Sequence, residues 1–91
     1  MRQQYLEVTF RRGRPIAAYY YLPRRPSQRS FRTVRVDPGM IIDYSRNGKP
    51  IGIEITAPTE LSLAAINCVL KELGLATVTR ADLMPLRAAT P

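Results

Sequence analysis

Apolar and polar residues alternate in two short stretches on either side of an Asn-Gly pair, and this pattern predicts a β-hairpin over residues 39–56. Asn47-Gly48 is a strong hairpin signal because both residues tolerate the positive φ that a type I′ turn requires. A two-residue loop there creates an apolar face with three cross-strand pairs: Tyr44 with Ile51, Ile42 with Ile53, and Met40 with Ile55. The other face is mostly polar and pairs Ile41 with Glu54, Asp43 with Gly52, and Ser45 with Pro50. A slip of one residue would mix the two faces, so the pattern also predicts the register.

Three further strands are predicted before this hairpin, over residues 5–10, 16–22 and 31–36. The turn between the first two contains Gly13 and Pro15, but its length is left open. A loop with an odd number of residues places Ile16, Ala18, Tyr20 and Leu22 beside the apolar face of the first strand. A loop with an even number of residues places Ala17, Tyr19 and Tyr21 there instead.

The third strand approaches the main hairpin through Asp37-Pro38-Gly39, which has the composition of a type II turn. A tight turn of this type would set Arg35 beside Ile42 and mismatch the faces. We therefore expect a looser or bulged connection that brings Val34 and Val36 to the Ile42 side.

The hydrophobic period changes to that of a helix after Pro58. Thr59 is the predicted N-cap. The apolar stripe consists of Leu63, Ile66, Val69, Leu70 and Leu73. Gly74 is placed to end the helix in a Schellman motif in which Leu75 folds back on Leu70.

The last stretch carries a weaker helical signal. Thr79 and Asp82 have the spacing of a capping box, Pro85 keeps any helix short, and residues 86–91 are expected to fray.

Together these elements predict an α+β fold in which an antiparallel β-meander of four to five strands packs on one C-terminal helix in two layers. Residues 1–78 are predicted to form this single domain. Residues 79–91 are predicted to add a short helical turn and a tail.

Positive charge is concentrated at the beginning of the chain. Residues 1–36 contain nine Arg and one acid, Glu7, which gives +8, whereas residues 37–91 contain five bases and six acids, which gives −1 and the total of +7. The chain has no His and a single Cys, so histidine general-base catalysis, an intrachain disulfide and a Cys-cluster metal site are excluded. No apolar run approaches the ~20 residues of a membrane span, and no signal sequence opens the chain, so a cytoplasmic protein without membrane contact is expected.

Two motifs of the main hairpin point to a family. Gly39-Met40-Ile41-Ile42-Asp43-Tyr44 and Ile51-Gly52-Ile53-Glu54-Ile55 closely resemble the two strands that mark the domain of unknown function 2283 family of small bacterial proteins. Ala18-Tyr19-Tyr20 stands where that family usually has Leu-Tyr-Ile, while arginines replace its Tyr-Asp-x-x-x-Asp lead-in. The resemblance implies a fold and a bacterial source. It implies no activity.

Two constellations could carry chemistry. Asp43 and Glu54 are predicted to be diagonal neighbours, roughly 7–8 Å apart, with Gly52 leaving room beside them. They are a candidate acid/base pair or oxygen-ligand metal site, and the alternative is a solvated face that Arg35 helps to neutralise.

The second constellation is a candidate nucleic-acid surface, made of Arg11, Arg12, Arg14, Arg24 and Arg25 with Tyr19 and Tyr21. Its alternative is structural: the tyrosines cover both faces of a strand, and the arginines keep a small protein soluble.

The preferred hypothesis is a binding module rather than an enzyme. It engages a protein partner as a homodimer or as one half of a toxin–antitoxin-like pair, and needs no cofactor or metal. Nucleic-acid binding through the Arg-rich half is the alternative, and an enzyme using Asp43 and Glu54 ranks last.

Overall fold

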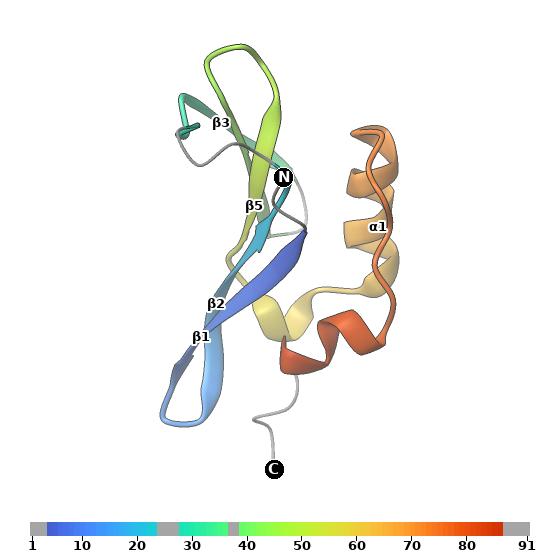
Figure 1. The fold of residues 1–91 in the computed structure, drawn as a ribbon. Coiled ribbons are helices and arrows are strands. Elements are labelled where there is room, and N and C mark those ends of the chain that lie inside the picture. Colours follow the sequence, from blue (N-terminus) through green and yellow to red (C-terminus); the bar gives the residue numbers. More distant parts are fainter. Residues whose placement is uncertain (1–3, 24–27, 37–38, 87–91) are drawn as a thin grey trace.

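A computed structural model describes residues 4–23, 28–36 and 39–86, which form a five-stranded antiparallel sheet with helix α1 (Leu63–Glu72) on one side (Figure 1). The strands are β1 (Tyr5–Arg11), β2 (Arg14–Tyr21), β3 (Arg32–Val36), β4 (Met40–Tyr44) and β5 (Pro50–Ile55). Two 3₁₀ helices, η1 (Pro58–Glu60) and η2 (Ala81–Leu86), lie on either side of α1 in the sequence. The predicted α+β class is confirmed.

The strand order is β1-β2-β5-β4-β3, which differs from the predicted meander. Strands β3, β4 and β5 do form a meander, but β2 pairs with β5 and sets Ala18 opposite Ile55 and Tyr20 opposite Ile53. This order places β5 in the centre, where Ile53 and Ile55 are fully buried. A meander would have left β5 at an edge, with its isoleucines partly exposed to water.

The register of the main hairpin is confirmed over most of its length. Met40 faces Ile55, Ile42 faces Ile53, and Asp43 faces Gly52, as predicted. A bulge then pairs Tyr44 with Pro50, so the predicted pairs Tyr44–Ile51 and Ser45–Pro50 are wrong.

The turn of this hairpin explains the shift. Ser45 N donates to the carbonyl of Lys49 at 2.8 Å, which closes a loop of three residues rather than two. Gly48 has φ +87, and Arg12 is the single described non-glycine residue with positive φ, so Asn47 does not adopt a type I′ conformation. The Asn47 side-chain oxygen accepts instead from Lys49 N at 3.3 Å and from the Ser45 hydroxyl, which fixes a turn with a left-handed glycine at its end.

The type I′ geometry occurs in the first hairpin, where Arg12 (φ +53) and Gly13 (φ +77) form a two-residue loop. Its register places Ala18 and Tyr20 beside Leu6 and Val8, the apolar set of the odd-loop alternative. The loop itself has an even number of residues. The odd-loop faces arise because a bulge opposite Thr9 and Phe10 adds one extra residue, Ile16, to β2. That bulge leaves Ile16 out of the core, at 47% exposure.

Strand β3 joins β4 as expected, with Val34 opposite Ile42 and Val36 opposite Met40. Gly39 has φ +67. The rest of the predicted Asp37-Pro38-Gly39 turn lies outside the described residues.

Helix α1 begins one turn later than predicted. Ser62, not Thr59, is the N-cap, and its hydroxyl accepts from Ala65 N at 3.0 Å. Thr59 lies within η1, and the extended backbone of Leu61 separates the two helices. The C-terminus is the predicted Schellman motif: Leu75 N donates to Leu70 O at 2.9 Å, and Gly74 has φ +73.

The segment after α1 is held by a pair of hydrogen bonds from one side chain. Asn67 Nδ2 donates to Val78 O at 3.0 Å, and Val78 N donates to Asn67 Oδ1 at 2.8 Å. The predicted capping box follows, with Thr79 N bound to Asp82 at 2.8 Å. Leu86 was expected to fray but is fully buried, because η2 contributes to the core; residues 87–91 lie outside the described part.

Candidate functional site

The sheet face opposite the core carries Tyr5, Tyr19 and Tyr21 together with several carboxylates, whereas Tyr20 and Tyr44 pack on the core side. Tyr5 lies beside Tyr21, Tyr21 beside Gly52, and Gly52 beside Asp43 in one row across the sheet. The next row contains Glu7, Tyr19, Glu54, Ile41 and Arg35. We call this surface the outer face.

Tyr19, Gly52 and Asp43 form the best-defined contact on the outer face. The Tyr19 hydroxyl donates to Asp43 Oδ2 at 2.7 Å, reaching from β2 across β5 to β4. A Cβ on Gly52 would lie 1.9 Å from the Tyr19 hydroxyl oxygen and 2.2 Å from Cζ. The room that the absent side chain leaves at Gly52 is therefore occupied by Tyr19, and glycine is required there for the contact to form.

The other tyrosines of this face contact one another and an acid. The rings of Tyr5 and Tyr21 stack with centroids 4.4 Å apart, and Tyr21 meets Tyr19 edge to face at 4.7 Å. The Tyr21 hydroxyl donates to Glu7 Oε1 at 3.0 Å. These ring geometries are typical of stabilising aromatic pairs. The contacts of Tyr21 with Tyr5 and Glu7 therefore stabilise the packing of β1 against β2.

The candidate acid pair is only partly assembled. Asp43 and Glu54 do lie in neighbouring rows, as predicted, but the Asp43 carboxylate is engaged by Tyr19. Arg35 lies opposite Ile41 on β3, two strands away from Glu54 on β5. Within residues 4–23, 28–36 and 39–86, no three His, Cys, Asp or Glu side chains are placed to share a metal ion.

The predicted nucleic-acid surface is divided in the structure. Its described arginines gather at the β1–β2 turn, where a hollow of about 600 Å³ is lined by Arg11, Arg12, Arg14 and Ile16. Tyr19 and Tyr21 belong instead to the outer face. Arg24 and Arg25 lie outside the described residues.

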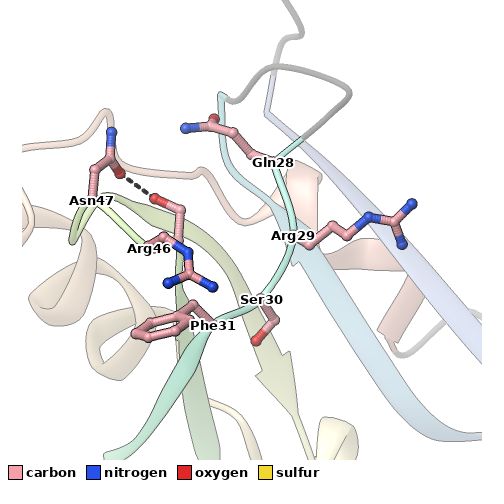
Figure 2. Close-up of a pocket in the computed structure, with 7 residues that line it drawn as sticks. Gln28, Arg29, Ser30, Phe31, Arg46 and Asn47 are labelled. Carbon is pink, nitrogen blue, oxygen red and sulfur yellow. Dashed lines mark hydrogen bonds between the residues drawn. The ribbon is translucent and has the colours of Figure 1, made fainter.

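A second hollow, of about 550 Å³, was not predicted from the sequence (Figure 2). It lies between residues 28–31 and residues 45–47, and we call it the turn pocket. Phe31 is 58% exposed there, and the Arg46 guanidinium lies 4.5 Å from the centre of its ring. The sequence signal for this pocket was a Phe close to several arginines. The contact of Phe31 with Arg46 could not be predicted from it, because that contact requires the pairing of β3 with β4.

Comparison with known families gives one finding. Residues 17–57 match the family described as protein of unknown function (DUF2283). The similarity to the DUF2283 family is therefore shown for this segment. The DUF2283 segment runs from β2 to β5 and therefore contains Tyr19, Asp43, Gly52 and Glu54, whereas β1 and the Arg12-Gly13 turn lie before it. Neither the curated proteins nor the solved structures gave a match.

None of the helices formed by the described residues is both long enough and apolar enough to cross a membrane.

Proposed function

We propose that this chain is a non-catalytic, cytoplasmic binding module that pairs the open edge of β1 with a strand of a second polypeptide, in the first instance a second copy of itself. The observation that supports the proposal is the character of β1. It is seven residues long, and the sheet pairs it on one side with β2. Tyr5 and Phe10 on this strand are 41% and 45% exposed.

The opposite edge offers a contrast. Strand β3 is shorter, with five residues, and carries exposed Arg32 and Arg35. Charged side chains and short strands are the usual means of preventing edge pairing, whereas an edge with exposed apolar residues favours it. Strand β1 is therefore the better edge for association.

A second copy fits β1 by side-chain complementarity. An antiparallel pairing centred on Val8 sets Leu6 opposite Phe10 of the second copy and Tyr5 opposite Arg11 of the second copy. These pairs join apolar with apolar residues on one face and a ring with a guanidinium on the other. Glu7 then lies diagonally from Arg11 and from Glu7 of the other copy, so the symmetric pair of Glu7–Arg11 contacts outweighs the single Glu7–Glu7 contact.

The test is the molar mass in solution, measured by light scattering over micromolar to millimolar concentration. We expect twice the 10.3 kDa of the chain. Phe10→Lys should return the monomer mass, and Phe31→Lys, at a somewhat more exposed aromatic away from β1, should not. A monomer at every concentration would reject the homodimer. If the immobilised unmodified chain then retains a small protein that Phe10→Lys does not retain, the toxin–antitoxin-like form of the proposal is identified instead.

Nucleic-acid binding by the first hairpin is a second candidate function, supported by its shape and charge. Pairing of β2 with β5 covers residues 18–21, so the remainder of the hairpin continues beyond the sheet as a two-stranded ribbon ending in the Arg12-Gly13 turn (Figure 1). The described residues that line the hollow at this turn include no acid. A two-stranded ribbon fits the major groove of a duplex, and arginines bind its phosphates.

A further inference from the structure

The turn pocket is held by backbone hydrogen bonds on both of its sides. Phe31 N donates to Tyr44 O at 2.8 Å and extends the pairing of β3 with β4 up to the pocket. On the other side, the bonds from Ser45 N to Lys49 O at 2.8 Å and from Gly48 N to Ser45 O at 2.9 Å fix the β4–β5 turn. The pocket is therefore formed before any ligand arrives, which lowers the entropic cost of binding.

Arg46 and the Asn47 amide supply hydrogen-bond donors to the pocket. A backbone N–H can only donate, so the bond from Lys49 N identifies the Asn47 atom that faces it as the oxygen, and the Ser45 hydroxyl binds the same oxygen. The Asn47 NH₂ group consequently points away from the turn (Figure 2). Among the described residues that line the pocket, none is acidic. Such a set of groups favours an anion.

The pocket also contains a flat apolar surface. Arg46 lies over the Phe31 ring in Figure 2, in the arrangement of a cation–π pair at 4.5 Å. Stacking of this kind holds the guanidinium flat and leaves its N–H edge available for hydrogen bonds. With 58% of Phe31 exposed, a second planar group can pack against the pair, as nucleic-acid bases do on aromatic rings and on guanidinium planes.

Arg29 differs from Arg46 although both line the pocket. Its side chain is directed to the other side of the segment, away from Arg46 and Asn47 (Figure 2). It adds positive charge to the region without facing the stacked pair. The chain thus offers two neighbouring arginines, one placed to contact a ligand and one not.

We propose that the turn pocket binds a nucleotide, with the phosphate at the N–H edge of Arg46 beside the Asn47 amide and the base packed against Phe31. The volume of about 550 Å³ lies within the range of small-molecule sites. The same chemistry is offered by a free mononucleotide and by a nucleotide of a single strand. The site lies at the β4–β5 turn, and the hairpin arginines lie at the opposite end of the sheet, so it is independent of both functions proposed above (Figure 1).

The experiment is a titration of the full chain, followed through its backbone amide signals by NMR, with adenosine monophosphate, thymidine monophosphate, inorganic phosphate and a short oligothymidylate. Adenosine monophosphate should shift the signals of residues 28–31 and 45–49, and inorganic phosphate should bind more weakly because it lacks the base. Oligothymidylate that binds more tightly than thymidine monophosphate identifies a strand as the ligand, and equal affinities identify a free nucleotide; both outcomes support the proposal.

Three variants make the test specific. Phe31→Leu should weaken nucleotide binding about fivefold or more, since stacking of a base contributes at least about 1 kcal/mol, while phosphate binding should fall much less, through the loss of the stacked position of Arg46 alone. Arg46→Gln should weaken both ligands, and Arg29→Gln, the matched control, should weaken both much less. Phe31 and both arginines are exposed, so the variants are expected to fold, which their amide spectra will verify. Absence of localised shifts at millimolar nucleotide, or equal losses for the two arginine variants, would overturn the proposal.

Discussion

Replacement of Gly52 tests the account of the outer face most directly. In Gly52→Ala the new methyl group would overlap the Tyr19 hydroxyl and Cζ, at 1.9 and 2.2 Å, so the ring must move off the sheet. The move breaks the 2.7 Å bond to Asp43 and the edge-to-face contact with Tyr21. A hydrogen bond to a charged partner contributes about 1.5–3 kcal/mol and an aromatic pair about 0.5–1.5 kcal/mol. Alanine recovers roughly 0.5–1 kcal/mol through the unfolded chain.

The expected net loss in the free energy of unfolding is therefore about 1–4 kcal/mol, measured by urea denaturation followed by circular dichroism. A second background gives the sharper result. In Tyr19→Ala nothing lies over Gly52, so adding Gly52→Ala should be neutral or slightly stabilising. If Gly52→Ala destabilises equally in both backgrounds, its effect does not pass through Tyr19 and the reasoning is refuted. Tyr21→Phe, which removes a more exposed hydroxyl bonded to Glu7, is the control and should cost less than Tyr19→Phe.

Three further predictions address other parts of the molecule. Burial raises the pKa of Tyr20 above its usual 10.0, opposed by the bond from Gln4, so its contribution to stability is present below pH ~10 and is lost as the pH rises through the raised pKa; the difference in unfolding free energy between the unmodified chain and Tyr20→Phe, followed from pH 8 to 11, should show this decline. Asn67→Ala should lower the free energy of unfolding by about 1–3 kcal/mol in urea titrations, because it leaves the N–H and C=O of Val78 without partners; an unchanged midpoint would contradict this role. If the first hairpin grips single-stranded nucleic acid, the slope of log affinity against log salt should flatten by about two units, at ~0.7 per lost phosphate contact, on substitution with Gln of Arg11, Arg12 and Arg14; a slope that ignores the triple substitution rejects that function.

The alternation of apolar and polar residues predicted those features of the fold that depend on a single hairpin. Met40, Ile42, Ile53 and Ile55 could be placed because a slip would move all of them to the wrong face. The bulge at Pro50 could not, since it follows from side-chain hydrogen bonds of Asn47 inside the turn. The helix cap was missed for a similar reason: Thr59 and Ser62 both have capping hydroxyls, and the choice depends on where the chain leaves η1.

The sites were harder to predict than the strands because they join hairpins. Asp43 and Gly52 could be paired from the sequence, but the arrival of Tyr19 above them requires β2 to lie beside β5. Alternation shows that β2 has an apolar face without showing which apolar strand adjoins it. The turn pocket has the same origin, since Phe31 and Arg46 meet through the pairing of β3 with β4.

The place of β5 between β2 and β4 also bears on how the chain folds. The β1–β2, β3–β4 and β4–β5 pairs each join strands that are neighbours in the sequence. The β2–β5 pair instead joins residues that are far apart in the sequence, such as Ala18 and Ile55. Closing that long loop costs entropy before its contacts form, so long-range pairing slows folding. The β1–β2 hairpin and the β3–β5 meander are thus natural early units, and their docking along Tyr20 and Ile53 is the expected rate-limiting step. Because both units form before that step, substitutions at either turn should slow refolding, whereas substitutions of contacts that form only after docking should mainly accelerate unfolding.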